Sequence, residues 1–218
     1  MPQGYEVNVR SYKETDKAGL RRISIETAFI GKSGEVFCDD QEILADWLTY
    51  YYLEFEPESS FVAEYQTKIV GYLMGCLNTK RYYNIFNQKI LPCLILKSLC
   101  RGLLFKIKTL RFIYYSLASL LRGEFKRPEF FSEYPAHLHI NIEARFRNRG
   151  IGTRLIEVFL NYLRDKGIQG VHAWTITEGG KNLFRSLGFR LLYNQKVTYF
   201  DYMLNRELYL TCFGKEII

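Results

Sequence analysis

Three arginines and two glycines are crowded into one segment, which reads R-F-R-N-R-G-I-G-T. Gly150 and Gly152 permit backbone conformations and close ligand approaches that a side chain would prevent. A helical pattern follows, and the unpaired N–H groups and the dipole at a helix N-terminus favour an anion. The residues that add fixed positive charge are Arg145, Arg147 and Arg149. The segment therefore predicts a cradle for a phosphate or a pyrophosphate.

Two common phosphate loops do not fit this segment. The pattern G-x-x-x-x-G-K-[ST] is absent from the sequence. The dinucleotide pattern G-x-G-x-x-G fails because Leu155 stands where the third glycine is required. What remains is R-x-x-G-I-G-T in front of an amphipathic helix.

Histidine is the second residue type here that could do chemistry. His137 and His139 are two residues apart in an apolar, strand-like run, so they share one face with Asn141. His172 lies in the next expected strand along the chain. Histidine takes up a proton near neutral pH, so all three are candidates for a general base. An equally open interpretation is that they are hydrogen-bonded core residues. No cysteine or carboxylate has metal-ligand spacing with them, so no metal is expected.

The elements that must position these residues follow from hydrophobic periodicity and turn signals. The expected strands are Tyr5–Ser11, Ser60–Tyr65, Lys68–Leu77, Ala136–Ile142, Val171–Ile176, a strand opening at G-F-R-L-L-Y, and Val197–Leu204. The expected helices run from Thr15 or Asp16 to about Thr27, from Asp39 to Pro57, over Arg154–Lys166 and over Gly180–Leu187. Gly71 and Gly75 interrupt the third strand, which suggests a bulge or a close backbone approach.

Three features together resemble the GNAT family of N-acetyltransferases. Arg147, Gly150 and Gly152 fill the pattern [Q/R]-x-x-G-x-[G/A] of its acetyl-CoA loop. The run N-L-F-R-S-L-G-F (Asn182–Phe189) is similar to its closing motif, and a strand, two helices and a hairpin open the chain in the family's order. The run from T-A-F-I-G to S-S-F-V-A-E resembles the branch that contains the acetyltransferase-like domain of O-GlcNAc hydrolase. The resemblance implies an α/β (α+β) acyl-CoA N-acyltransferase fold. In it, a mixed, mostly antiparallel sheet is splayed at the cofactor cleft, with helices on both faces.

The same resemblance implies acetyl-CoA as the cofactor and a primary amine, of a small molecule or a protein lysine, as the acceptor. Backbone groups of Ile140 and Ile142 would pair with the pantetheine arm. In the arylalkylamine acetyltransferases a pair of strand histidines serves as base, but counting back from the glycines places that pair one residue out of register with His137 and His139. The loop residues that would hold the pyrophosphate are Arg147, Asn148, Arg149, Gly150, Ile151, Gly152 and Thr153.

The sequence departs from the family at the general acid. The family tyrosine of L-Y-x-x-x-G-F corresponds to Phe184, which has no proton to give, and Asn182 stands near it in the cofactor region. Either the thiolate leaves unassisted or takes its proton from water, or Tyr193 or Tyr199 reaches the site, or activity is low. A catalytically weak acyl-CoA-binding module is therefore the alternative to an active enzyme.

The positive charge of the chain belongs to one segment. The net charge is +7, and residues 80–127 carry eleven basic residues and one acid, 11 − 1 = +10, which leaves −3 for the rest. This segment lies in an expected helical insertion at about 79–134, between the third and fourth strands, which we expect to form two helices broken near Gly102 or before. Three interpretations stay open: a helical wall that shapes the substrate mouth, a surface for an anionic membrane or acidic partner, and a solvated face. Nucleic acid is not the expected partner, because no recognition motif accompanies the charge.

Cysteine usage and hydropathy bear on the compartment. The five cysteines form no C-x-x-C pair, the N-terminus is polar, and no apolar run is long enough to span a bilayer. We therefore expect a cytoplasmic protein with free thiols, built as a single domain over residues 1–218, as a monomer or homodimer.

Overall fold

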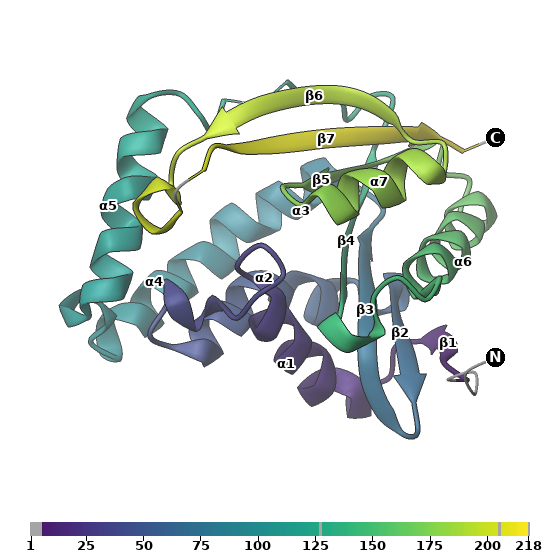
Figure 1. Ribbon diagram of the computed structural model, residues 1–218, viewed down its shortest axis with the longest axis horizontal. Coiled ribbons are helices and arrows are strands. Elements are labelled where there is room, and N and C mark those ends of the chain that lie inside the picture. Colours follow the sequence, from purple (N-terminus) through teal and green to yellow (C-terminus); the bar gives the residue numbers. More distant parts are fainter. Residues whose placement is uncertain (1–5, 127, 205, 218) are drawn as a thin grey trace.

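One mixed sheet organises the chain, of which the computed structural model describes residues 6–126, 128–204 and 206–217 (Figure 1). The strand order is β1-β2-β3-β4-β5-β7-β6, and every neighbouring pair is antiparallel except β4 and β5. The strands are β1 (Asn8–Ser11), β2 (Ser60–Tyr65), β3 (Lys68–Cys76), β4 (Ala136–Ile142), β5 (Gly170–Thr175), β6 (Arg190–Val197) and β7 (Leu208–Glu216). The predicted mixed, mostly antiparallel sheet is confirmed.

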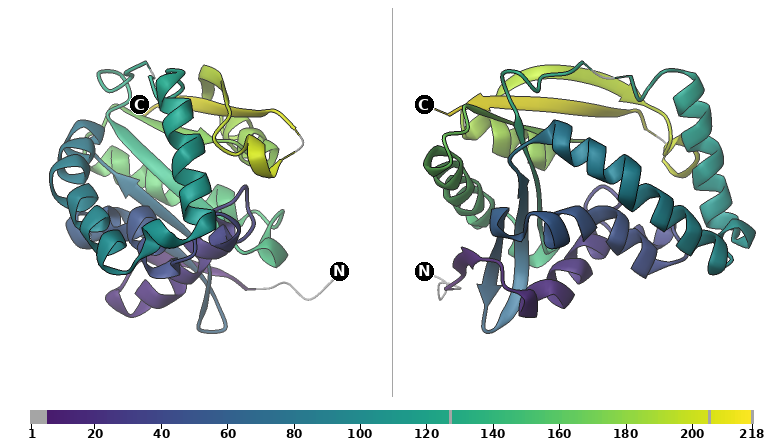
Figure 2. Two further views of the ribbon diagram at one scale, coloured as in Figure 1. Left: turned by 90° about the vertical axis from the view of Figure 1, so that its left-hand side faces the viewer. Right: turned by 180° about the vertical axis from the view of Figure 1, so that it is seen from behind.

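Helices cover both faces of this sheet, as predicted (Figures 1 and 2). The helices are α1 (Lys17–Thr27), α2 (Gln41–Phe55), α3 (Thr79–Ile85), α4 (Leu91–Cys100), α5 (Ile107–Leu121), α6 (Ile151–Asp165) and α7 (Glu178–Ser186). The apolar stripe of α6 packs with Phe184 of α7 in one core cluster, whereas α1, α2 and α4 bury their apolar faces in a second cluster on β2 and β3. The sheet is thus a wall between two cores.

The sheet opens between β4 and β5. These parallel strands are paired only from Ala136 to Leu138 on β4 and from Val171 to Ala173 on β5. Beyond Leu138, β4 continues to Ile142 and keeps its antiparallel partner β3 on the other side. The edge of β4 that faces away from β3 is therefore open at residues 139–142. This is the splay that the sequence analysis predicted.

The two glycines of β3 have the roles expected of them. The pairing of β2 with β3 shifts next to Gly71, which marks a bulge. A Cβ at Gly75 would lie 2.2 Å from the ring of Phe159, so the glycine lets α6 pack directly against the strand. The position of α6, which carries the glycine loop at its start, depends on this contact.

The basic segment forms the helical insertion between β3 and β4. Helix α3 continues through a π-helical stretch, Phe86–Ile90, into α4. Gly102, at φ 67°, breaks the path, and α5 follows. The sequence predicted two helices broken near Gly102 or before, and the structure has two helical arms that separate at Gly102. Over the described residues, no helix combines the length and the apolar character needed to cross a membrane.

One predicted strand is wrong, and several element boundaries differ from the predictions by one to three residues. The predicted strand Val197–Leu204 is wrong: β6 ends at Val197, a 3₁₀ turn occupies Asp201–Met203, and the last strand is β7. The turn forms because Phe200 is buried in a third core cluster, with Phe29, Phe37 and Leu44, and this burial holds the chain in place.

Helix α6 begins at Ile151 rather than Arg154. The first helix turn of α2 is capped by Asp40, not Asp39, since the Asp40 carboxylate accepts the Glu42 and Ile43 N–H groups at 3.1 Å. Strand β1 begins at Asn8, and the predicted start at Tyr5 lies outside the described residues.

Candidate active site

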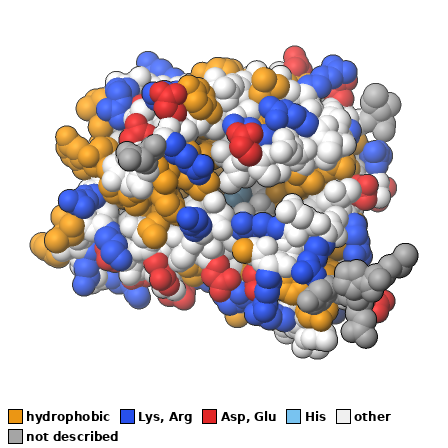
Figure 3. Space-filling view, in the orientation of Figure 1, with side chains coloured by type: hydrophobic (Ala, Val, Ile, Leu, Met, Phe, Trp, Pro, Cys, Tyr) orange, Lys and Arg blue, Asp and Glu red, His pale blue; other side chains and the backbone are white. Residues whose placement is uncertain are grey.

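A cleft of about 870 Å³ occupies the opening between β4 and β5. It is bounded by β4, by the loop into α6, by the first turns of α7 and, at its other end, by α1, α2 and β7. Figure 3 shows a histidine side chain within a hollow near the centre of this face of the molecule. The sequence-predicted residues that line the cleft are His139, Ile140, Ile142, Arg147, Asn148, Gly150, Ile151, Gly152, Thr153, Asn182 and Phe184.

The glycine loop takes its shape from a short series of turns. A 3₁₀ turn at Ala144–Phe146 ends β4, and Asn148 and Gly150 then adopt left-handed conformations with φ values of 58° and 74°. These two residues turn the chain so that α6 starts with its N–H groups at the cleft. The first N–H groups of a helix have no partner within it, so this end of the cleft can bind an anion.

Gly152 serves a different purpose from Gly150. A Cβ at Gly150 would meet no atom within 4 Å, so this glycine is needed only for its positive φ. A Cβ at Gly152 would lie 2.9 Å from the Leu183 side chain of α7. Gly152 therefore lets α6 and α7 approach each other closely at the mouth of the anion site. An added side chain there would fill the space beside the helix N–H groups.

The three loop arginines do not act together. Arg147 lines the cleft and is held in place, because its guanidinium donates to the carbonyls of Ile142 and Gly31, both at 3.0 Å. Arg145 and Arg149 lie over the ring of Phe146 and line a separate hollow with Tyr65 and Lys68. The expected cluster of three positive charges in the cleft is therefore reduced to Arg147. The 3₁₀ turn at Ala144–Phe146 and the left-handed conformation of Asn148 change the chain direction on either side of Arg147, and Arg145 and Arg149 lie on the other side of the loop.

Two of the three histidines are turned away from the cleft. The Nε2 atom of His137 is 2.9 Å from the Tyr52 hydroxyl, and its Nδ1 atom is 2.8 Å from Thr79 Oγ1. His172 is buried and donates from Nδ1 to the carbonyl of Tyr134 at 2.9 Å. Burial lowers the pKa of both imidazoles below the ordinary value, so both rings are neutral at pH 7. Neither residue lines the cleft.

His139 is the histidine that the fold presents to the cleft. Its Nδ1 atom is 3.4 Å from the hydroxyl of Tyr72, which in turn accepts a hydrogen bond of 3.0 Å from the Asn141 side-chain amide. Tyr72 is fully buried, so its own proton needs an acceptor, and Nδ1 of His139 provides one. The neutral ring then carries its proton on Nε2. Burial lowers the pKa of His139 to about 4, which keeps the ring neutral across the physiological range.

The tyrosine candidates lie away from the cleft. Tyr199 stacks on Phe125 with ring centroids 5.9 Å apart, and Tyr193 packs against Trp174; neither residue lines the cleft. Phe184 does line it. Its ring is 2% exposed and contacts Phe189 and Phe213 at centroid distances of 5.2 and 5.8 Å. No tyrosine is among the described residues that line the cleft, so this geometry supplies no phenol as a general acid.

The end of the cleft opposite the glycine loop is apolar. The described residues lining the whole cleft include no Asp, Glu or Lys. Helix α5 of the insertion supports this wall, since Phe112 stacks on Phe200 with ring centroids 5.8 Å apart. The apolar residues that line the cleft outside β4, the glycine loop and α7 are Ala28, Ile30, Leu48, Trp174, Ile176, Phe200 and Leu210, and the hydroxyl residues Ser24 and Thr27 lie among them.

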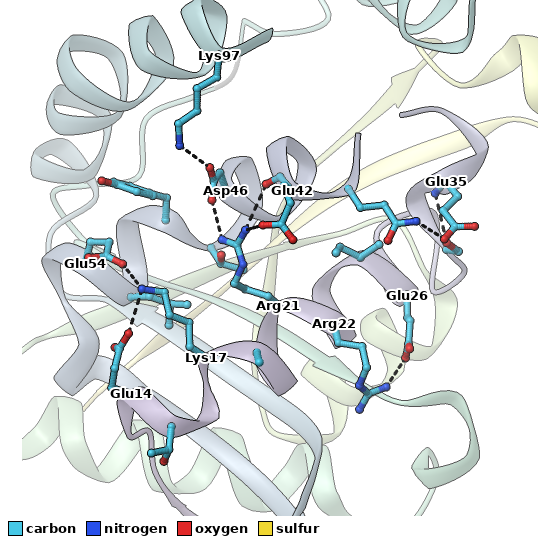
Figure 4. Close-up of a pocket in the computed structure, with 18 residues that line it drawn as sticks. Glu14, Lys17, Arg21, Arg22, Glu26, Glu35, Glu42, Asp46, Glu54 and Lys97 are labelled. Atoms are coloured by element: carbon cyan, nitrogen blue, oxygen red, sulfur yellow. Dashed lines mark hydrogen bonds and ion pairs between the residues drawn. The ribbon is translucent and has the colours of Figure 1, made fainter. Parts of the chain in front are cut away.

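A second hollow, of about 840 Å³, lies between α1 and α2 (Figure 4). It is lined with charged side chains, but these neutralise one another. Arg21 is paired with Glu42 and Asp46, and Lys17 with Glu14 and Glu54; Lys97 reaches Asp46 from α4. Since every basic side chain of the lining is already ion-paired with an acid, we assign no ligand to this hollow.

The fold and the cleft define a class of protein. Similar solved structures include SsHAT (23% identity, 97% of this chain and 98% of that chain, TM-score 0.70). They also include a Drosophila melanogaster polyamine N-acetyltransferase that forms N-acetylagmatine (16% identity, covering 97% of this chain and 100% of that chain, TM-score 0.59). A third is yncA of Salmonella typhimurium, a putative acetyltransferase with its cofactor acetyl-CoA (13% identity, covering 97% of this chain and 94% of that chain, TM-score 0.56). The chain therefore has the acyl-CoA N-acyltransferase fold of the GNAT acetyltransferases. Residues 121–189, which hold β4, the glycine loop, α6, β5 and α7, match the model of the acetyltransferase (GNAT) family.

Tyr72 and the apolar wall were not identified from the sequence. Tyr72 lies on β3 directly opposite Asn141, and this register depends on the pairing of strands 69 residues apart in sequence. The alternation of β3 indicates only that Tyr72 shares a face with Met74. Trp174 follows His172 by two residues in β5, so the alternation of the strand could have placed both on one face.

Proposed function

We propose that this protein is an acetyl-CoA-dependent N-acetyltransferase that acetylates a primary amine. The observation that carries the proposal is the combination of the open edge of β4 and the N-terminus of α6 in one cleft. Backbone groups of Ile140 and Ile142 would pair with the pantetheine arm, and the loop N–H groups with Arg147 would hold the pyrophosphate. When bound, acetyl-CoA supplies the activated acetyl group, and the chain supplies positioning and hydrogen bonds.

The residues present fit such a cofactor. The space beside Gly150 is open, and Gly152 leaves room that a side chain would fill. Asn148 and Gly150, in left-handed conformations, direct the chain so that consecutive N–H groups face the cleft. Because the N–H groups and Arg147 are fixed before the ligand arrives, little ordering would be needed on binding.

The acceptor is proposed to be an amine on an apolar body. An amine must lose its proton before it can attack a carbonyl, and an apolar site favours the neutral form. The cleft lining contains no carboxylate that would hold an ammonium group or a second positive charge. The polyamine acetyltransferase of Drosophila melanogaster has the same fold, but the lining described here does not favour a polycation.

His139 is proposed to act as a hydrogen-bond donor. Its Nδ1 atom faces Tyr72, so Nε2–H is the group available to the reacting centre. A neutral N–H donor stabilises the negative charge that develops on the carbonyl oxygen during attack. This role differs from the general base suggested by the sequence, and a pKa of about 4 explains the difference, because a base that weak has little tendency to take a proton from an amine.

A second candidate function is an acyl-CoA-binding module with weak or no turnover. The observation that favours it is Phe184, which places a phenyl ring where the family pattern has a phenol. The likeness of residues 27–64 to the branch containing the acetyltransferase-like domain of O-GlcNAc hydrolase points the same way. Binding of acetyl-CoA is common to both candidates, and turnover separates them.

The test combines calorimetry with a thiol-release assay. We expect acetyl-CoA to bind with one site per chain, and we expect release of CoA with 2-phenylethylamine to exceed that with agmatine at equal concentration by at least tenfold. The reason is that agmatine must bury a guanidinium group with no carboxylate to pair with it. A lysine-containing peptide completes the panel. Binding without release on any amine would support the module, agmatine as the best acceptor would contradict the apolar site, and no binding would exclude both functions.

Replacing Phe184 by tyrosine tests the missing general acid. The new phenol would lie on the wall of the cleft, where it can give a proton to the departing thiolate. We expect turnover to rise by about tenfold or more and the acetyl-CoA affinity to change little. The measurement is the steady-state rate of thiol release with the best amine of the panel.

Phe189→Tyr is the matched control for this change. Phe189 belongs to the same aromatic cluster and is equally buried, but it does not line the cleft. Both variants place a hydroxyl in an apolar cluster and should lose a similar, small amount of stability. A rate increase in Phe189→Tyr of the same size, or a decrease in Phe184→Tyr, would show that a phenol at position 184 does not act on the leaving group.

A further inference from the structure

Helix α5 carries an apolar stripe on its outer face. Its members recur at intervals of three and four residues, which places them in one line along the helix. Phe105, just before the helix, and Leu121, its last residue, have 87% and 89% of their surface exposed. We call this stripe, with Phe105, the α5 face; its residues are Phe105, Ile107, Leu110, Tyr114, Leu117 and Leu121.

The α5 face is not the side by which the helix packs on the protein. The opposite side carries Phe112 and the buried residues Thr109 and Ser119. Thr109 is held by the Asp39 carboxylate at 3.1 Å, and Ser119 lies 3.2 Å from the Thr198 hydroxyl. The helix is therefore apolar on a second side that the core does not need. Large exposed apolar stripes of this kind mark interaction surfaces in monomeric proteins.

Positive charge lies beside the α5 face. Residues 80–127 hold eleven basic residues and a single acid, Glu124. That acid is buried, and its carboxylate accepts hydrogen bonds from Arg122 at 2.9 Å and from Thr198 at 2.6 and 2.8 Å. Lys106 and Arg111 are exposed on or beside the face. The surface thus combines apolar side chains with the positive charges of Lys106 and Arg111, and the one acid of residues 80–127 is already bound to Arg122 and Thr198.

We propose that the α5 face docks on a bilayer that contains anionic phospholipids. Helices that lie in the membrane interface have this composition, with Leu, Ile, Phe and Tyr on one side and Lys and Arg beside them. Anionic headgroups complement the charge, and acyl chains accept the exposed side chains. Figure 2 (left) shows α5 standing at the front of this end of the molecule, and Figure 3 shows apolar and basic side chains together at the left, where Figure 1 places α5. The face protrudes, so it fits a flat surface.

A second copy of the chain fits this surface less well. Two α5 faces brought together would place Lys106 and Arg111 of each copy near those of the other, and the only acid of the segment is already bound within its own chain. Like charges brought together in an interface are unfavourable. The charge pattern therefore selects an anionic partner over self-association.

Docking would also fix the orientation of the cleft. The inner side of α5 reaches the cleft wall through Phe112 and Phe200. A membrane on the outer side of the same helix would therefore lie close to the apolar end of the cleft. The docking itself does not depend on the proposed acetyltransferase activity, and it is measured without any substrate.

Vesicle co-sedimentation with the full-length protein tests the proposal. The probes are vesicles of phosphatidylcholine alone and of phosphatidylcholine with 30% phosphatidylserine. We expect binding at least tenfold stronger to the anionic vesicles. The double variant Leu117→Gln/Leu121→Gln should lose at least tenfold of that binding, and Lys106→Gln/Arg111→Gln should lose about tenfold or more, at about fivefold per charge.

Matched controls lie on β6, whose first residues are at the opposite end of the molecule from α5 (Figure 1). Leu191 is 58% exposed, close to the 55% of Leu117, and Arg190 is also exposed, so Leu191→Gln and Arg190→Gln should bind as the wild type does. All the changed side chains are exposed, and circular dichroism melts should confirm unchanged folding. The proposal is overturned by binding that is absent or equal on both vesicles, or by unchanged binding of the leucine variant. It is also overturned if the protein is retained on polyglutamate but does not bind vesicles. A dimer seen in light scattering that is absent in the Leu117→Gln/Leu121→Gln variant would overturn it as well.

Discussion

Replacing His139 by phenylalanine is expected to lower kcat by about a hundredfold while the dissociation constant for acetyl-CoA changes by less than threefold. The ring of His139 lines the cleft and has one nitrogen facing Tyr72, so the variant removes the N–H that we propose as the donor to the reacting carbonyl. Removal of one donor from an oxyanion site typically costs about a hundred- to a thousandfold in rate. Steady-state kinetics and calorimetry on the same preparation measure the two quantities.

The pH dependence distinguishes a donor from a base. The folded-state pKa of His139 is lowered to about 4, so the ring takes up a proton only near that pH. At saturating amine, kcat should therefore show no inflection from His139 between pH 5 and 8. A base with an ordinary histidine pKa would make kcat fall tenfold per unit below about pH 6.5. Such a fall, lost in the His139→Phe variant, would contradict the donor role.

Two further variants complete this test. Tyr72→Phe removes the partner of Nδ1 and should lower kcat several-fold, because the tautomer with the proton on Nε2 is no longer favoured. His137→Gln changes a histidine whose two ring nitrogens are bonded to Tyr52 and Thr79 in the interior. It should lower the melting temperature by several degrees and leave kcat of the folded protein within threefold. A catalytic loss in His137→Gln as large as in His139→Phe would return both histidines to the list of candidates.

Replacing Gly152 by valine is expected to weaken acetyl-CoA binding by about a hundredfold or more. A Cβ at this position would lie 2.9 Å from Leu183 and 3.4 Å from Ile142, so the branched side chain can only be placed by moving α7 or by filling the anion site. Each hydrogen bond from the backbone to a charged phosphate contributes about 1.5–3 kcal/mol, and the loss of one or two such bonds corresponds to this change in affinity. Calorimetry with acetyl-CoA measures it directly.

Gly167→Val is the matched control at the other end of the same helix. Gly167 has φ 67°, and a Cβ there would meet no atom within 4 Å. The substitution strains the backbone and lowers stability, but it leaves the cleft unchanged. Acetyl-CoA affinity should equal that of the wild type. A folded Gly152→Val protein with wild-type affinity would mean that the loop is not the anion site.

Patterns local to one element predicted much of the fold. The runs S-F-V-A-E-Y and A-H-L-H-I-N-I have the bounds of β2 and β4 that the structure shows. The break at Gly102 and the bulge beside Gly71 were also predicted, since glycine marks such places by its own conformational freedom. The last strand was misplaced because V-T-Y-F-D-Y-M-L alternates as a strand does. The burial of Phe200 in a distant cluster decided otherwise.

For the candidate site, the sequence by itself determined which residues share an element. It placed His137 and His139 on one face of β4 and the glycines between β4 and α6, because these relations depend on backbone periods of two and 3.6 residues. Only the tertiary structure decided which of them reach the cleft. Tyr52 and Thr79 enclose His137, Tyr72 leaves His139 facing the cleft, and a 3₁₀ turn directs Arg145 away from it. These contacts join segments far apart in the chain, and their register is set by packing that no local pattern contains.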